Sequence, residues 1–113
     1  MSKDDLRYVG HMLDLSRKAS EKVQGLERRD YDSDENLRLA LAHLVQMIGE
    51  AARRVPSALR DSHPEVPRAD IVGMRSKIVH DYMNVDEDIV WEVVTRDLPT
   101  LVVALERMPP PDA

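Results

Sequence analysis

Cysteine and phenylalanine are absent from this 113-residue sequence, and glycine and aromatic residues are scarce, with four Gly, three Tyr and one Trp. The lack of cysteine excludes a disulfide framework, a thiol nucleophile and a zinc site built on thiolates. No apolar run approaches the roughly 20 residues that a membrane-spanning helix needs, and the first residues carry no apolar segment typical of a signal peptide. We therefore expect a cytoplasmic protein without a membrane partner.

Positive charge is also in short supply. The chain has 16 Lys and Arg against 21 Asp and Glu, which gives a net charge of −5. A protein that coats nucleic acid nonspecifically is normally basic, so any nucleic-acid contact must be local and involve few phosphates. Hydrophobic residues make up 42% and charged residues 33% of the chain, a composition typical of one soluble globular domain.

Helix-forming residues dominate long stretches of the chain. Strand-like alternation never extends beyond a few residues, and no Asn-Gly or Asp-Gly hairpin signal occurs. Apolar residues recur at three- and four-residue spacing, which predicts helices over about residues 3–25, 33–55, 68–83 and 86–105. The sequence therefore predicts an all-α, antiparallel four- to five-helix bundle over residues 1–108, followed by a Pro-rich tail over 109–113.

Capping and breaking residues mark the ends of the predicted helices. Ser33 is a suitable N-cap for the second helix, and Asp86 is the corresponding candidate for the fourth. Pro99 interrupts the apolar pattern of the fourth helix, so we expect a kink or a restart there. Residues 28–32 are polar and predict a connection between the first two helices.

The predicted helix over 68–83 differs from a helix that faces only its own core. At steps of about 100°, its apolar residues cover roughly half of the helical wheel, with Arg75 in the middle of that arc. Ser76 and His80 form an i, i+4 pair on the flank of the arc. The extra apolar width predicts a second partner surface, and we expect a homodimer formed through this helix.

Two interpretations of these polar residues stay open on the pattern alone. A guanidinium cannot lose its charge, so Arg75 needs acceptors or a water-lined cleft, and an acidic side chain would satisfy it. His80 is also compatible with an ordinary histidine at the helix boundary. On an ideal helix the two residues are about 140° apart and about 7.5 Å apart along the axis. A long side chain, a local irregularity or a facing copy of the helix must bring them together.

Arg75, His80 and Tyr82 follow the pattern Arg-x4-His-x-Tyr. This pattern resembles the signature of the HEPN superfamily, and the similarity is greatest to its HepT-like toxin branch. Residues 48–52 resemble part of the second helix of that branch, and residues 89–99 resemble a later block in the same order.

The resemblance implies a bundle that dimerises through its motif helices, so that two motifs meet in one composite cleft. Many members are endoribonucleases that need no metal. In the toxin branch, a minimal nucleotidyltransferase acts as antitoxin by transferring AMP to the motif tyrosine. On this sequence, Arg75 and His80 would be the catalytic pair and Tyr82 the modified residue. The implied partners are a second copy, an RNA substrate and the cognate nucleotidyltransferase, and we expect no cofactor and no metal site.

Supporting roles and an alternative function stay open. Ser76 follows the motif arginine where the family often has Asn, Asp or His, although Ser can still donate and accept hydrogen bonds. Glu50 could orient Arg75 or His80 across the bundle, or be a solvated carboxylate. Tyr82 lies on the apolar arc and is also compatible with a core tyrosine. The alternative function is a non-catalytic helical partner or substrate-binding subunit of a nucleotidyltransferase, which Ser76 favours slightly.

Overall fold

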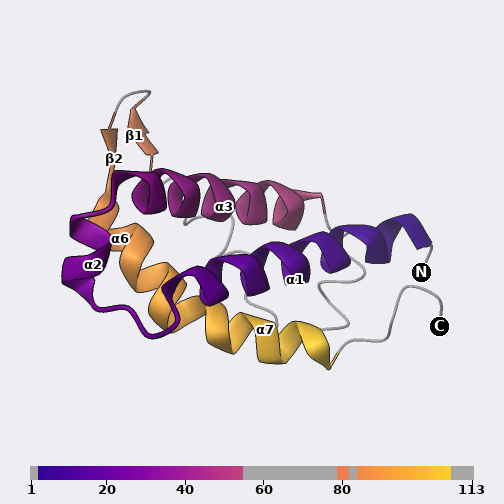
Figure 1. Cartoon of the computed structure of the whole chain (residues 1–113). Coiled ribbons are helices and arrows are strands. Elements are labelled where there is room, and N and C mark those ends of the chain that lie inside the picture. Colours follow the sequence, from indigo (N-terminus) through magenta and orange to yellow (C-terminus); the bar gives the residue numbers. More distant parts are fainter. Residues whose placement is uncertain (1–2, 55–78, 82–83, 108–113) are drawn as a thin grey trace.

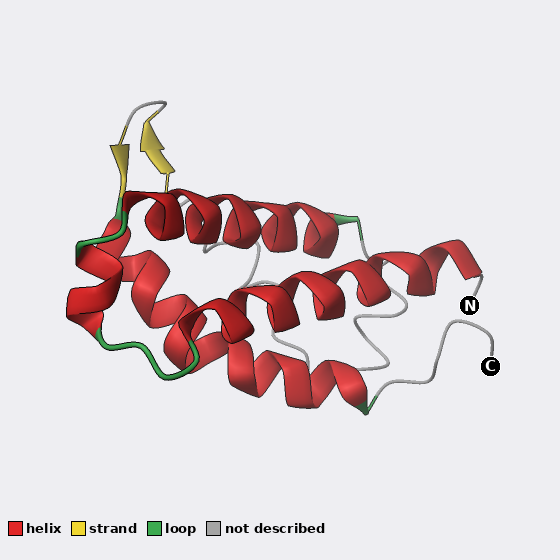
Figure 2. Cartoon of the chain, in the orientation of Figure 1, coloured by secondary structure: helices red, strands yellow, loops and turns green. Residues whose placement is uncertain are grey.

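The computed structural model describes residues 3–54, 79–81 and 84–107, with side chains over 7–54 and 86–107. In chain order, the elements are α1 (Lys3–Val23), α2 (Arg28–Asp32), α3 (Glu35–Arg53), β1 (Val79–Asp81), β2 (Asn84–Val85), α6 (Glu87–Glu92), the π-helical turn η1 (Val93–Asp97) and α7 (Leu98–Glu106). Figures 1 and 2 show α1 and α3 side by side and antiparallel, and the continuous α6–η1–α7 segment packs against both. The predicted all-α bundle is confirmed, with a short two-stranded ribbon added to it.

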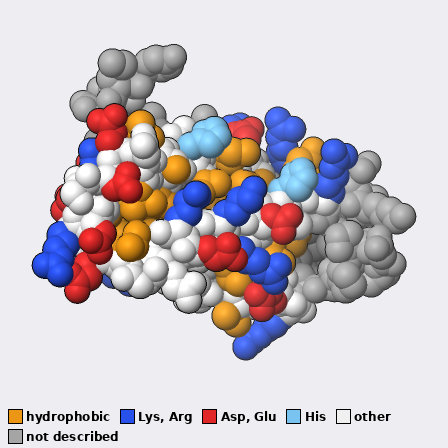
Figure 3. All heavy atoms as spheres, in the orientation of Figure 1, with side chains coloured by type: hydrophobic (Ala, Val, Ile, Leu, Met, Phe, Trp, Pro, Cys, Tyr) orange, Lys and Arg blue, Asp and Glu red, His pale blue; other side chains and the backbone are white. Residues whose placement is uncertain are grey.

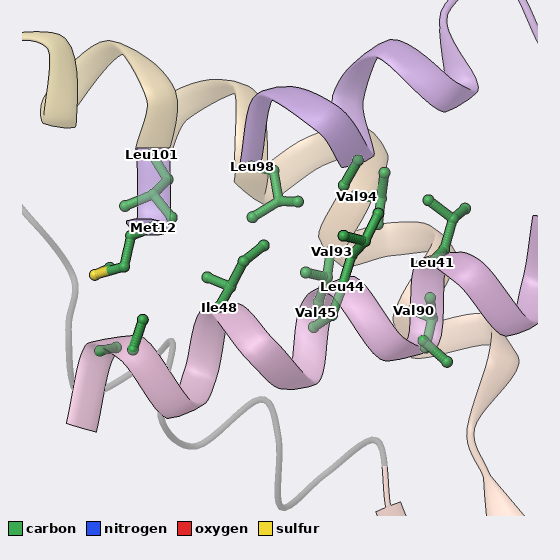
Figure 4. Packing of buried hydrophobic residues seen from close by; sticks show 14 of the residues in the cluster. Met12, Leu41, Leu44, Val45, Ile48, Val90, Val93, Val94, Leu98 and Leu101 are labelled. Carbon is green, nitrogen blue, oxygen red and sulfur yellow. The ribbon is translucent and has the colours of Figure 1, made fainter. Parts of the chain in front are cut away.

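The core is aliphatic and lies where α1, α3 and the α6–η1–α7 segment meet. Figure 4 shows Met12 of α1 beside Leu101 of α7, and Ile48 of α3 directed toward Leu98. Each of these four side chains is at most 2% exposed. Full burial of such a side chain stabilises a fold by about 1.5–3 kcal/mol. The apolar spacing that predicts the helices therefore marks the faces that meet in the core.

α1 ends at Val23, slightly before the predicted end at Gly25. Gly25 has a φ of 78°, which is the left-handed conformation that glycine adopts without a Cβ clash. The Leu26 N–H donates to the Val23 carbonyl at 2.9 Å. The glycine therefore turns the chain out of α1 and toward the next element.

The predicted connection over 28–32 is wrong, because these residues form the short helix α2. The Glu27 N–H donates to Asp30 Oδ2 at 2.8 Å, which satisfies a backbone donor at the start of the helix. Tyr31 is completely buried, and its hydroxyl donates to the Glu87 carbonyl at 2.9 Å. This buried tyrosine anchors α2 to the beginning of α6, although the other residues of α2 are polar.

Aspartates cap the two helices for which caps were predicted. The N-cap of α3 is Asp34 and not Ser33, since Asp34 Oδ1 accepts from the Leu37 N–H at 3.0 Å. Ser33 instead ends α2, where its hydroxyl donates to the Asp30 carbonyl at 3.2 Å. The predicted cap of the last helical segment is confirmed, because Asp86 Oδ1 accepts from the Ile89 N–H at 3.2 Å.

The expected irregularity near Pro99 takes the form of a π-helical turn in an otherwise continuous helical segment. Residues 93–97 form the π-helical turn η1, and α7 begins at Leu98 with Pro99 in its first turn. Proline has no N–H to donate, and it lies directly after the turn in which the regular α-helical bonding pattern changes. In the described ranges, no helix is both long and apolar enough to cross a bilayer.

The predicted helix over 68–83 is wrong where the structure describes it. Residues 79–81 form β1 and pair antiparallel with β2, with Val79 opposite Val85 and Asp81 opposite Asn84. Valine is favoured in strands because its branched side chain suits an extended backbone. The remainder of that predicted helix, 68–78 and 82–83, and the predicted tail over 109–113 lie outside the described residues.

Candidate functional site

The predicted site residues are described unequally by the structure. Arg75, Ser76 and Tyr82 lie outside the described residues, and His80 is described only through its backbone in β1. The helical wheel that relates His80 to Arg75 does not apply to the extended segment 79–81. Their meeting in one site and the dimer that would form it stay predictions.

Glu50 is the predicted site residue whose side chain the structure describes. It lies near the C-terminal end of α3, where its Oε2 accepts from Arg53 Nη1 at 3.3 Å. Its other oxygen, Oε1, is 3.7 Å from Arg54 Nε, which forms an ion pair. Glu50 therefore lies close to two guanidinium groups of its own helix, and its predicted role toward Arg75 or His80 stays a prediction.

Arg54 links this end of α3 to an aromatic residue of α1. Its guanidinium carbon lies 5.9 Å from the centre of the Tyr8 ring, within the range of a cation–π contact. The Tyr8 ring also meets the His11 ring edge-on, with centres 6.2 Å apart. A side-chain hydrogen bond with Tyr8, followed by the charges of Tyr8 and Glu50, raises the pKa of Arg54. A guanidinium is cationic at physiological pH, so Arg54 places a positive charge beside Tyr8, where α3 lies next to α1.

An open hollow of about 570 Å³ lies between α1 and α3 at this position. We call it the α1–α3 hollow, and it is lined by Arg7, Tyr8, His11, Asp14, Leu15, Met47, Glu50, Ala51 and Arg54. Its volume is in the range of small-molecule sites. On the face shown in Figure 3, cationic, acidic and histidine side chains surround exposed hydrophobic atoms. Polar groups of both charge signs thus border an apolar surface.

This hollow was not predicted, although part of its pattern is present in the sequence. Arg7, His11 and Asp14 are spaced by four and three residues, and therefore share one side of α1. Arg54, in contrast, reaches this side only because α3 lies antiparallel to α1. Helical periodicity could have identified the α1 half, but the pairing with α3 is a tertiary contact.

Metal binding is not indicated within the part of the chain that the structure describes. No group of three or more His, Asp or Glu side chains there is placed to hold a metal ion. Arg75, Ser76 and Tyr82 are outside that part, so the expectation of a metal-free site stays a prediction for the motif.

Comparisons with known proteins assign the chain to a family. A family model described as ribonuclease HepT-like matches residues 12–108. A protein of Caldanaerobacter subterraneus subsp. tengcongensis, named as a putative RNase, is 34% identical over 94 residues, covering 83% of this chain and 84% of that protein. A probable ribonuclease HepT of Thermococcus cleftensis is 27% identical over 106 residues, covering 94% of each chain. No solved structure matches the chain significantly.

The matched region contains part of α1 and all of α3, the Arg-x4-His-x-Tyr segment and α7. It therefore includes the blocks on which the resemblance in the sequence rests, and it covers far more than half of the chain. The chain belongs to the ribonuclease HepT-like family of the HEPN superfamily.

Proposed function

We propose that this protein is a metal-independent endoribonuclease that acts as the toxin of a toxin–antitoxin pair. The observation that carries the proposal is the family match over residues 12–108, which includes Arg75, His80 and Tyr82 at the spacing Arg-x4-His-x-Tyr. Names of relatives such as ribonuclease HepT support the RNase activity. The antitoxin partner, the dimer and the modification are implied by the family resemblance.

RNA supplies its own nucleophile for the reaction. A base removes the proton of a 2′-hydroxyl, the 2′-oxygen attacks the adjacent phosphorus, and the bond from phosphorus to the 5′-oxygen breaks. An acid then protonates the leaving 5′-oxygen. The products are a 2′,3′-cyclic phosphate and a 5′-hydroxyl. DNA lacks the 2′-hydroxyl and is not cleaved by this route.

His80 and Arg75 have the chemistry that these steps need. An imidazole titrates near neutral pH and can act as base or acid, so His80 of one copy accepts the 2′-hydroxyl proton and His80 of the second copy donates to the 5′-oxygen. Arg75 places paired N–H donors on the phosphate and stabilises the charge that develops on it. A dimer is required because one copy provides a single motif histidine.

Tyr82 provides the control point in this proposal. The nucleotidyltransferase joins the AMP group of ATP to the Tyr82 hydroxyl, with pyrophosphate leaving and the hydroxyl proton released. The added phosphate is anionic and can pair with Arg75, so it competes with RNA for the same guanidinium. Modification at Tyr82 therefore prevents cleavage.

Cleavage of RNA by the purified protein tests the catalytic assignment. His80→Ala should reduce the rate by about 100-fold or more, since general acid–base catalysis typically contributes 10²–10⁴-fold. His43→Ala is the matched control, because His43 is an exposed histidine of α3 outside the motif. Full activity of His80→Ala, or complete loss of activity with a chelator, would contradict the assignment.

A growth assay and mass spectrometry test the toxin assignment. Expression should arrest growth, His80→Ala should relieve the arrest, and the cognate transferase with ATP should add the mass of one AMP to the wild type but not to Tyr82→Phe. If the transferase binds the chain while no RNA cleavage occurs, the non-catalytic partner function is correct instead. Ser76 in the motif is the sequence feature that favours this second candidate.

A further inference from the structure

We propose that the α1–α3 hollow binds one ribonucleotide of the RNA strand, with its base on the apolar lining and its phosphate on Arg7 and Arg54. This inference rests on the proposed ribonuclease function for the identity of its ligand. The described residues that line the hollow come from α1, from α3 and from Arg54 at the C-cap of α3. Neither the family motif nor the proposed mechanism uses these residues, apart from the supporting role considered for Glu50.

An apolar surface with an aromatic edge is available for the base. Leu15 and Ala51 line the hollow beside Met47, whose side chain is 41% exposed. The half-buried ring of Tyr8 stands at the same surface. Bases of single-stranded RNA stack on aromatic side chains, and this contact tolerates any base because every base has a flat face. The exposed methionine gives this surface a further apolar and adaptable contact.

Two arginines, one from each helix, border the hollow and can hold a phosphate. Arg54 has a side chain that is 59% exposed, and its 3.7 Å separation from Glu50 exceeds hydrogen-bond length. A guanidinium has five N–H donors, so contacts with Tyr8 and Glu50 leave donors for a ligand. Arg7 is exposed and lines the same hollow from α1. Paired guanidinium donors match the oxygens of a phosphate.

The two carboxylates of the hollow restrict what it can bind. Asp14 and Glu50 repel an uninterrupted run of phosphates, but they accept hydrogen bonds from ribose hydroxyls and base amino groups. A simple anion would leave the apolar lining without a partner, and an apolar ligand would leave the arginines without one. A ribonucleotide uses the apolar, the cationic and the acidic side chains of the lining. The small number of phosphate contacts also agrees with the net charge of −5.

Binding of a short fluorescent single-stranded RNA, followed by anisotropy, tests the proposal. The full-length protein carries His80→Ala in every arm, so that cleavage does not consume the RNA. Tyr8→Leu should raise the Kd by about 5- to 100-fold through loss of stacking. Arg54→Ala should raise the Kd by about 10-fold and flatten its salt dependence. Arg96→Ala is the matched control, because Arg96 is 74% exposed and lies on η1, outside the hollow.

The outcomes separate this proposal from the proposed function. Arg54 is exposed, so Arg54→Ala should fold normally. An unchanged Kd in both Arg54→Ala and Tyr8→Leu would overturn the nucleotide site. Equal affinity for DNA of the same sequence would overturn the ribose contacts. In the cleavage assay without the His80 change, Tyr8→Leu should raise KM and leave kcat unchanged. If His80→Ala still cleaves RNA while Tyr8→Leu weakens binding, the catalytic assignment fails and the nucleotide site stands.

Discussion

Tyr31 and Tyr8 lie near opposite ends of α3, and each has an arginine close to its ring. Arg28 lies 5.5 Å from the centre of the Tyr31 ring, and Arg54 lies 5.9 Å from that of Tyr8. Tyr31 is completely buried and packs on Trp91 with ring centres 5.0 Å apart. Tyr8 is half-buried and lines an open hollow. A tyrosine and an arginine therefore stabilise the fold at one end of α3 and offer a surface to a ligand at the other. The difference lies in the burial of the tyrosine ring.

Truncation of each tyrosine should give the largest contrast between the two ends. Tyr31→Ala should lower the free energy of unfolding by about 3–5 kcal/mol, because it removes a buried ring and leaves the Glu87 carbonyl without its donor. Tyr8→Ala should lower it by less than about 1 kcal/mol. Urea denaturation followed by circular dichroism measures both values. Equal losses would show that Tyr8 is also a core residue, and the contrast would be lost.

Raising the pH should test the effect of burial on the Tyr31 hydroxyl without removing its ring. Burial, followed by the charge of Glu87, raises the pKa of Tyr31 from 10.0 to about 12. Between these values the unfolded chain has lost the Tyr31 proton and the folded chain has kept it. The stability contributed by this proton is therefore fully present below pH 10 and is lost as the pH rises through 12.

Tyr31→Phe provides the control for this titration, because it lacks the hydroxyl and keeps the ring. The wild type should be more stable than Tyr31→Phe by about 1 kcal/mol near pH 8. That advantage should shrink as the pH rises from 10 toward 12, as measured by urea denaturation at each pH. A constant difference across this range would mean that Tyr31 titrates as it does in the unfolded chain.

The smallest expected effects compare polar groups at the two ends of α3. Asp34→Ala removes the N-cap and should cost about 1 kcal/mol of stability. Glu50→Gln removes two ion pairs, with Arg53 and Arg54, of a carboxylate that is 43% exposed, and should cost less than about 0.5 kcal/mol. Thermal unfolding of the two variants makes this comparison. A larger loss in Glu50→Gln would give Glu50 a structural role that its contacts do not predict.

The long helices were predictable from the sequence because local pattern and tertiary burial agree there. Met12 and Ile48 fall on the apolar stripes of their helices, and both are buried in the core. The cap at Asp86 was predictable because it needs only the first turn of its own helix. The family was also predictable, since the spacing of Arg75, His80 and Tyr82 requires no structure.

The features that escaped prediction depend on contacts between distant residues. α2 is too short to show a period, and its anchor is the bond from Tyr31 to Glu87 at a separation of 56 residues. The segment 79–81 fits a helical wheel, but its pairing with Val85 takes an extended backbone. The α1–α3 hollow needs two helices in register, which no single stretch of sequence displays. Arg75 lies outside the described residues and His80 is described only through its backbone, so the site that they would form stays a prediction.

The π-helical turn η1 gives the C-terminal arm of the bundle one residue that it can lose. The Leu98 N–H donates to the Val93 carbonyl five residues earlier, so this turn contains one residue more than a regular α-helical turn. Deleting an exposed residue here, such as Thr95, would allow an uninterrupted α-helix with Val90 and Leu101 still directed to the interior. Loss of a single residue in this turn during divergence would therefore leave the packing of the molecule unchanged.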